Sequence, residues 1–341
     1  MLASRRSVAL LIAGALALVA CGEKDEPAPR AAGPVPQLDP PQAAEPRPGP
    51  VLTEPLTGLE LDAGSRPEGI AIDPRSHVAA VAVDDPPRLI LFDTKARRRT
   101  GVVRLPSSAR HVTLAAPGGP FLVPCEDADT LAEVSVDGKT VRTVKVGDNP
   151  HDAAALGDRT FVVNEFDSTM STVRDGRVVS TVPVDAQPGG IAAVGGKLYV
   201  NAVRAYTIEE HSAGDQPAGT GAQSSGLGPS HVVEGPGGRI AISDTRGRAM
   251  VVYDTRPRLR FRARVPLAGT PVGLAWDGKR TMWVTLSEAN LVVPVDLAGD
   301  RPRVGKALAT RQTPLSVAVD TSTGLLAVAG ADDGKVLFLQ P

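Results

Sequence analysis

From about residue 55 to the C-terminus, the chain alternates short apolar runs with turns rich in glycine, proline and aspartate. The unit that opens at residue 150 is the clearest, with apolar runs at 153–156, 160–164, 169–173 and 177–184. An Asp-Gly pair separates the last two runs, and such a pair is a strong hairpin signal. Each unit therefore predicts four short antiparallel strands, and no helical periodicity of useful length competes with them.

This unit returns about every forty residues. A motif of proline, two residues and a small or apolar residue opens a strand each time, and the seven copies begin at residues 67, 109, 150, 188, 229, 271 and 314, with Ala109 replacing the proline. The spacings are 42, 41, 38, 41, 42 and 43 residues. A strand-rich repeat of this period is typical of a β-propeller with one four-stranded blade per repeat. The sequence thus predicts an all-β, seven-bladed β-propeller over residues 53–341.

The two ends of the repeat region complement each other. The last unit stops after a third strand at residues 335–339, whereas residues 56–61 form a strand that precedes the first motif. We expect this N-terminal strand to complete the last blade and close the ring, which removes the exposed edges of an open sheet. The fourth unit is the least regular, because residues 211–227 are rich in Gly, Ser, Ala and Gln and predict a flexible excursion between two strands.

The start of the chain predicts export. Residues 1–20 combine Arg5 and Arg6 with an apolar run that is long enough for a secretory signal and too short for a membrane span. Small residues and then Cys21 end that run, as in a bacterial lipoprotein signal, so we expect a lipid on Cys21. An ordinary signal peptide with an incidental cysteine is the alternative. The segment Ser4 to Val8 also fits twin-arginine export in part, so the export route stays open.

Residues 21–52 hold nine prolines and almost no large apolar side chains, which predicts a disordered, extended tether. The whole chain has 37 basic and 38 acidic residues, and loss of residues 1–20 would leave 35 against 38. This balance gives no reason to expect a nucleic-acid partner. With Cys21 lipidated, Cys125 has no partner for a disulfide and is expected to be an inert thiol. We expect a monomer.

One stretch resembles a known repeat. Residues 160–173 contain Phe-Val-Val-Asn and are similar to the repeat of the YVTN family of bacterial β-propellers, and residues 197–201 match it less fully. The aromatic content of 3% is lower than is usual in that family. The resemblance implies an exported or surface protein with a WD40-like ring. Related seven-bladed rings include streptogramin (virginiamycin B) lyase and lactonases, so it leaves an enzymatic role open.

Propeller geometry predicts where a functional site would lie. The motif loops and the ends of the second strands meet at the same mouth of the central channel. We therefore expect a ligand site formed by Arg110, His111, Glu126, His151, Asp152, Asn164, Glu165, His231 and Asp244. Glu68, Ser230, Asp84, Cys125 and Asn201 come from equivalent positions.

Three of the five histidines fall within two residues of a motif start, and each has an acid at the end of the next strand. Imidazole with carboxylate suits a divalent metal or acid–base catalysis. The metal candidates are His111, His151, Glu126 and Glu165. The alternative is that these histidines only pack and hydrogen-bond the loops, and the blade of His231 lies across the ring from the other two. His77 and His211 are expected to be solvated.

Two basic segments of the chain allow two interpretations. Residues 95–99 include four basic side chains, and Arg258, Arg260, Arg262 and Arg264 alternate along an outer strand. Charged outer strands deter pairing between sheets, which is the favoured interpretation. Contact with an anionic envelope polymer or lipid headgroup is the alternative.

Together these features predict a propeller held by lipid on the extracytoplasmic side of a membrane of the bacterial envelope, acting as a non-enzymatic binding scaffold for an envelope protein or polymer. The alternative is a metal-assisted lyase or lactonase at the channel mouth, and a purely structural envelope component is a third class. The sequence names no ligand, substrate or partner, and does not separate inner from outer membrane.

Overall fold

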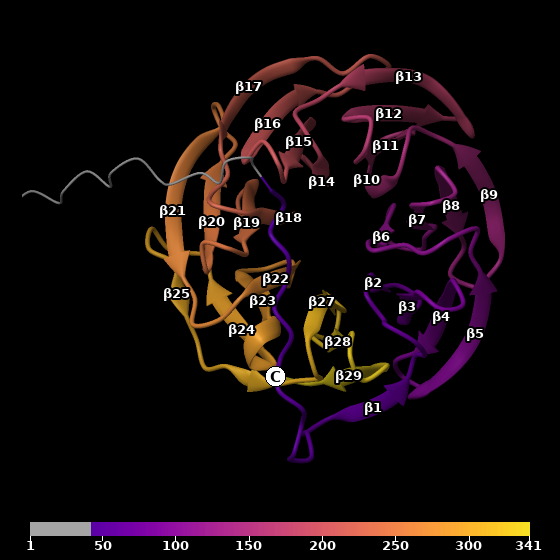
Figure 1. Cartoon of the computed structure of the whole chain (residues 1–341), viewed down its shortest axis with the longest axis vertical. Coiled ribbons are helices and arrows are strands. Elements are labelled where there is room, and N and C mark those ends of the chain that lie inside the picture. Colours follow the sequence, from indigo (N-terminus) through magenta and orange to yellow (C-terminus); the bar gives the residue numbers. More distant parts are fainter. Residues whose placement is uncertain (1–41) are drawn as a thin grey trace, which may run out of the picture. The chain divides into compact units, whose positions relative to one another are not determined.

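The computed structural model describes residues 42–341. Seven antiparallel sheets follow one another around a central channel, so the predicted all-β seven-bladed propeller is confirmed (Figure 1). The only helical element in this range is a 3₁₀ turn at Ser287–Ala289. No helix among these residues has the length and apolar character needed to cross a membrane. The predicted signal peptide, Cys21 and the tether up to residue 41 lie outside the described residues.

The first four blades are regular four-stranded sheets, with strands in chain order from the channel outward. Blade 1 contains β2 (Ile70–Asp73), β3 (Val78–Val83), β4 (Arg88–Asp93) and β5 (Arg98–Arg104). Blade 2 contains β6 (Thr113–Leu114), β7 (Phe121–Cys125), β8 (Thr130–Val134) and β9 (Thr140–Lys145). Blade 3 contains β10 (Pro150–Leu156), β11 (Arg159–Asn164), β12 (Thr169–Arg174) and β13 (Arg177–Pro183). Blade 4 contains β14 (Pro188–Val194), β15 (Lys197–Ala202), β16 (Thr207–Ser212) and β17 (Gly219–Ser224).

Blade 5 is regular, blade 6 has a divided outer strand, and blade 7 takes its outer strand from the start of the described chain. Blade 5 contains β18 (Pro229–Gly235), β19 (Arg239–Asp244), β20 (Ala249–Asp254) and β21 (Arg260–Pro266). Blade 6 contains β22 (Pro271–Trp276), β23 (Thr281–Leu286), β24 (Leu291–Asp296), β25 (Arg303–Val304) and β26 (Leu308–Ala309). Blade 7 contains β27 (Pro314–Val319), β28 (Leu326–Gly330), β29 (Lys335–Leu339) and β1 (Leu59–Asp62).

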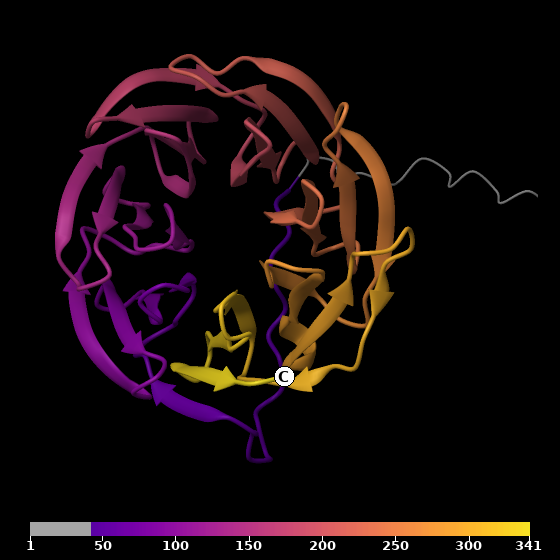
Figure 2. The ribbon, with the colours of Figure 1, turned by 180° about the vertical axis from the view of Figure 1, so that it is seen from behind.

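The ring closes as the sequence predicts. Strand β1 pairs with β29 in an antiparallel register that runs from Leu59 opposite Phe338 to Asp62 opposite Lys335. Figure 2 shows the indigo strand β1 and the yellow C-terminal strand meeting at this blade. Blade 7 therefore joins the two ends of the propeller.

The core lies between the blades. Seven apolar clusters fill the seven junctions between adjacent sheets. In β3, Ala80 and Ala82 pack toward blade 2, whereas Ala79 and Val81 pack toward blade 7. Both faces of a middle strand are thus buried, which explains why these strands are continuously apolar rather than alternating.

The expectation of a flexible excursion at residues 211–227 is wrong. Residues Gly219–Ser224 form β17, which pairs with β16 along its length. Every residue of β17 is exposed. An outermost strand needs only backbone hydrogen bonds to its neighbour, so small and polar residues suffice there. His211, expected to be solvated, lies on β16 with 3% of its surface exposed, and this prediction is also wrong.

Part of the predicted tether contacts the ring. We call residues 42–50 the strap, which runs beside the inner ends of β18 and β22 (Figures 1 and 2). At one end, Arg246 donates to the carbonyl of Gln42 at 3.0 Å. At the other end, the Asn290 amide donates to the carbonyl of Pro50 at 2.7 Å. The strap is therefore attached to blades 5 and 6.

Candidate functional site

A cavity of about 490 Å³ occupies the channel at the mouth where the motif loops lie. Its charged and imidazole side chains come mainly from these loops. Its walls are apolar, and strands β22 and β27 supply Leu274, Trp276, Val317 and Val319. Residues 43–46 of the strap line it as well. A concave, largely apolar pocket with a few convergent polar groups is the usual form of a small-molecule site.

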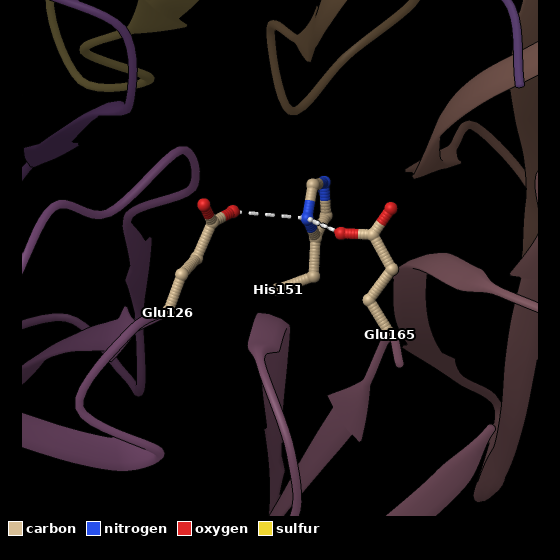
Figure 3. A group of neighbouring side chains, drawn as sticks. All are labelled: Glu126, His151 and Glu165. Atoms are coloured by element: carbon tan, nitrogen blue, oxygen red, sulfur yellow. Dashed lines mark ion pairs between the residues drawn. The ribbon is translucent and has the colours of Figure 1, made fainter. Parts of the chain in front are cut away.

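His151 lies between two carboxylates at this mouth (Figure 3). Its Nδ1 is 3.1 Å from Glu126 Oε1 and 3.0 Å from Glu165 Oε2. Neither His151 Nδ1 nor Glu126 Oε1 makes a hydrogen bond of good geometry, so charge attraction dominates these contacts. All three residues are at least nine-tenths buried. The chain thus places one imidazole and two acids from blades 2 and 3 in contact, as the sequence predicts.

The two acids set the charge of His151. Burial alone would lower the pKa of its imidazole, but the paired carboxylates of Glu126 and Glu165 raise it to about 10. Burial would raise the pKa of Glu165, but the contact with His151 lowers it to about 2. At neutral pH, His151 is therefore a cation held between two anions.

The three mouth histidines lie close together, with the ring of His111 between and tilted against the other two. The ring centroid of His111 is 4.9 Å from that of His151 and 4.6 Å from that of His231. The blade of His231 does lie across the ring, but the channel is narrow enough for the imidazoles to meet. Burial and then the neighbouring imidazole of His231 hold the pKa of His111 well below 6.5. Burial and the nearby His151 lower the pKa of His231 to about 4, so His111 and His231 are both neutral.

Arg110 is surrounded by acids. Its Nε lies 3.5 Å from Glu126 Oε1. Burial would lower the pKa of Arg110, but the charges of Glu126, Glu68, Glu165 and Glu45 raise it. Arg110 therefore stays a cation whose charge is already balanced.

Gly69 permits this arrangement. A Cβ at Gly69 would lie 2.8 Å from the backbone carbon of His111 and 2.9 Å from the carbonyl oxygen of Arg110. Only glycine allows the loop of blade 1 to approach the Arg110–His111 backbone so closely. The glycine at the third position of this motif copy therefore serves contact between neighbouring blades.

Four predicted site residues are not among those lining the cavity: Glu126, which adjoins it, and Asp152, Asn164 and Asp244. The Asp152 carboxylate accepts from the backbone amides of Ala153 and Ile191, at 2.8 and 3.0 Å, and so joins blades 3 and 4. Burial raises its pKa to about 7.

The side chains of Asn164 and Asp244 stabilise loops. The Asn164 amide donates to the hydroxyls of Thr169 and Ser171, at 2.9 and 3.0 Å. The Asp244 carboxylate accepts from the amide of Gly228 at 2.9 Å and pairs with Arg264 at 2.6 Å. Hydrogen-bonding side chains at strand ends are as useful to a turn as to a ligand, so their positions alone could not separate the two roles.

The remaining candidates fall outside the charged group. Cys125 is fully buried, and burial raises its pKa to about 11, so its thiol stays protonated. His77 in the turn after β2 is not fully solvated, because its Nδ1 lies 2.7 Å from Asp320.

The alternating arginines bind acids of their own blade. Arg260 and Arg262 contact Asp254 at 3.2 and 3.4 Å. Together with the Arg264–Asp244 pair, these contacts agree with a structural role for the outer strand. Among the described residues, the basic side chains at 95–99 have no ion pair within 4.0 Å.

The sequence alone missed several residues of the site. Gln187 donates to Glu165 Oε1 at 2.6 Å and directly precedes a motif proline, so the repeat offered a signal for it. Trp276 and Glu234 lie deeper in the channel, and their positions in the strands gave a weaker sequence signal. Glu45 belongs to the strap, which no repeat pattern indicates.

Glu126, His151 and Glu165 have the composition of a divalent-metal site. Their ligand atoms lie within 4.8 Å of one another, and within the described chain this is the one group of that kind. His111, predicted as a further ligand, is not part of it. Two of these atoms, Glu126 Oε1 and His151 Nδ1, lack a good hydrogen bond, which fits an ion in place of the Nδ1 proton.

Comparison with known proteins supports the fold. No protein-family model and no curated protein sequence matches the chain. Hydrazine synthase of Kuenenia stuttgartiensis is 15% identical, with a TM-score of 0.68 over 82% of this chain and 96% of that one.

Two further solved structures have similar folds. The propeller domain of Cps50 (Swd1) from Myceliophteria thermophila is 10% identical, with a TM-score of 0.70 over 83% of this chain and 99% of that one. Virginiamycin B lyase from Staphylococcus aureus is 12% identical, with a TM-score of 0.68 over 83% of this chain and 98% of that one. At these identities the likeness establishes a propeller fold and leaves function to the site.

Proposed function

We propose that this protein is a binding protein of the bacterial envelope that holds a small-molecule ligand in the mouth of its propeller, without catalysing a reaction. The observation that supports this proposal is the cavity of about 490 Å³, with polar groups at its mouth and apolar walls below. The polar groups are held by neighbouring blades, so the site needs little rearrangement to accept a ligand. The partner would be an envelope protein or polymer that carries a chemical group able to occupy this cavity.

Native mass spectrometry of the full-length protein, isolated under mild conditions, tests this proposal. We expect a stoichiometric ligand that is lost from Val233→Trp, because Val233 lines the cavity and a larger side chain would fill it. Val141→Trp is the control, since Val141 is exposed on the outer strand β9. Absence of any ligand, together with no thermal stabilisation by added cations, anions or neutral compounds, would contradict a binding function.

We also propose that Cys21 carries a lipid that anchors the propeller on the extracytoplasmic side of a membrane, and that the chain is a lipoprotein of YVTN type. The signal-like sequence of residues 1–20 supports the anchor. Metabolic labelling with radioactive palmitate should mark the wild-type protein and not Cys21→Ser. Labelling of both proteins, or of neither, would remove the anchor from the proposal.

A second candidate is a metal-assisted lyase or lactonase. It is favoured by the Glu126–His151–Glu165 cluster and by the likeness to virginiamycin B lyase. A bound divalent ion would polarise a substrate carbonyl at this position. Glu126 and Glu165 would hold such an ion, and His151 would contribute Nδ1 only after losing its proton. The neutral His111, 4.9 Å from His151, would then be the nearest imidazole able to accept a substrate proton.

Metal analysis separates the two candidates. An enzyme of this kind should contain one divalent ion, lose thermal stability with a chelator, and lose the ion in Glu165→Gln. Glu133→Gln is the control, because Glu133 is a buried glutamate outside the cluster. A protein that contains no ion and whose melting temperature does not change with a chelator would eliminate the enzymatic candidate and leave the binding function.

A further inference from the structure

The cavity contains more negative than positive charge. Glu45, Glu68, Glu165 and Glu234 line it, Glu126 adjoins it, and the facing cations are Arg110 and His151. Two of these acids, Glu126 and Glu165, balance the two cations through the ion pairs described above. Three carboxylates remain without a counterion.

The three surplus acids are Glu45, Glu68 and Glu234. Among residues 42–341, none of their carboxylates has an ion pair within 4.0 Å or a side-chain hydrogen bond. Burial raises the pKa of Glu68 despite the attraction of Arg110, and burial also raises that of Glu234. Glu45 is exposed, but Glu68 and Glu234 are partly removed from water without a partner, which costs free energy that a cation in the cavity would offset.

The neutral imidazoles complement these acids. His111 and His231 line the same cavity, and within the described chain neither ring makes a hydrogen bond. A neutral imidazole has one nitrogen that accepts a hydrogen bond. The cavity therefore offers acceptors to a ligand that carries N–H donors.

The surplus acids are too dispersed for one metal ion. Glu68 precedes the innermost strand of blade 1, at the mouth, whereas Glu234 lies near the far end of β18. Glu234 is four positions along the strand from the mouth residue Ser230, which is about 13 Å. None of the three acids belongs to the one compact group of possible metal ligands. The occupant needs positive charge at more than one point along its length.

We propose that the cavity binds an elongated organic cation of the linear polyamine class, with ammonium groups at Glu68 and Glu234 and its methylene chain along the apolar wall. This inference rests on the proposed function, because it names the ligand class of that same site. Glu45 of the strap supplies a third carboxylate at the entrance. The wall formed by Leu274, Trp276 and Val317 contacts the uncharged part of the ligand.

Isothermal titration calorimetry of the full-length protein with spermidine tests the proposal, with butylamine as the single-charge comparison. We expect spermidine to bind and butylamine to bind at least about tenfold more weakly, since a charged hydrogen bond contributes about 1.5–3 kcal/mol. Glu68→Gln and Glu234→Gln should each weaken spermidine about tenfold or more. Glu54→Gln is the matched control, because Glu54 is exposed and outside the cavity.

Circular dichroism of each variant establishes that it is folded. Equal affinity for spermidine and butylamine, or full affinity in both folded variants, would overturn the inference. If spermidine does not bind but native mass spectrometry finds another ligand that Val233→Trp loses, the ligand class is wrong and the binding function stands. If magnesium alone binds and Glu165→Gln abolishes it, the site is a metal centre and the polyamine assignment fails.

Discussion

Two histidines of the same mouth, His151 and His231, differ in charge because of what lies beside each one. His151 contacts two carboxylates, which raise its pKa to about 10, so its imidazole is protonated at neutral pH. His231 contacts no acid within 4.0 Å among the described residues, and burial with the nearby His151 lowers its pKa to about 4. One residue type therefore supplies both a fixed cation and a neutral acceptor.

His231 should make the fold sensitive to acid. Its pKa is lower in the folded chain than the ordinary 6.5, so the unfolded chain binds the proton more readily. The stability contributed by neutral His231 is present above pH 6.5 and is lost as the pH falls toward 4. At pH 5 this loss is about 2 kcal/mol.

Urea unfolding of the wild type and His231→Gln between pH 7 and pH 5 measures this effect. The wild type should lose more stability than the variant, because glutamine does not titrate. The comparison cancels other groups such as Asp152, whose raised pKa acts in the opposite direction. Parallel pH profiles of the two proteins would show that His231 is not the source.

At the same scale, the sequence predicted which residues reach the mouth better than what they do there. The repeat placed His111, His151 and His231 correctly, because strand starts are fixed by the blade geometry. It did not separate Glu165, which faces the cavity, from Asp244, which accepts from loop amides. Both are acids at or just after a strand end, and only the local backbone path distinguishes them.

Among the elements, the closing strand β1 is held by more than its backbone pairing. Arg311, in the loop before β27, lies 2.7 Å from Glu60 of β1 and 2.7 Å from Asp333 of the loop before β29. Its side chain is 8% exposed. Lys335 also contacts Glu60, at 3.6 Å, but is 39% exposed. These contacts join both ends of the propeller to blade 7.

Arg311→Ala should lower the free energy of unfolding by about 3 kcal/mol, because it leaves Asp333 without a counterion and Glu60 with only the exposed Lys335. Lys335→Ala removes an exposed partner of the same glutamate and should cost less than about 1 kcal/mol. Guanidinium unfolding of both variants checks the difference. Equal losses would mean that Arg311 contributes no more to closure than a surface charge.

The outer strands show where element prediction fails. Strand β17 was missed because its residues carry no apolar signal, and an exposed outermost strand does not require one. Middle strands such as β3 were easy to predict, since burial on both faces demands apolar residues throughout. Sequence patterns report burial, so they lose strands that form through backbone pairing alone.

At the scale of the whole propeller, the strap links the N-terminal segment to the mouth. Its contacts are mostly to backbone carbonyls, and Arg246 reaches those of both Gln42 and Ala43. Tyr206 also donates to the carbonyl of Gln42, at 2.8 Å. Backbone acceptors are present at every residue, which is why composition alone gave a disordered tether over residues 21–52 and no sign of this contact.

Arg246→Ala should release the strap while leaving the ring folded. Limited proteolysis should then cut near residues 42–50 several times faster than in the wild type, because the bound segment loses its anchor at blade 5. Arg248→Ala is the control, since Arg248 pairs with Glu288 and makes no hydrogen bond to the strap. Unchanged cleavage would mean that Arg246 is not needed to hold it.

The closure of blade 7 also determines when the molecule can become complete. Leu59 and Phe338 are paired neighbours in the sheet, although they are separated by 338 − 59 = 279 positions in the chain. During synthesis, β1 leaves the ribosome first and must wait for β29, so the seventh sheet forms only after nearly the whole polypeptide exists. If β29 then meets the β1 of another copy before its own, the two chains exchange strands, which makes a domain-swapped dimer the expected assembly error of this fold.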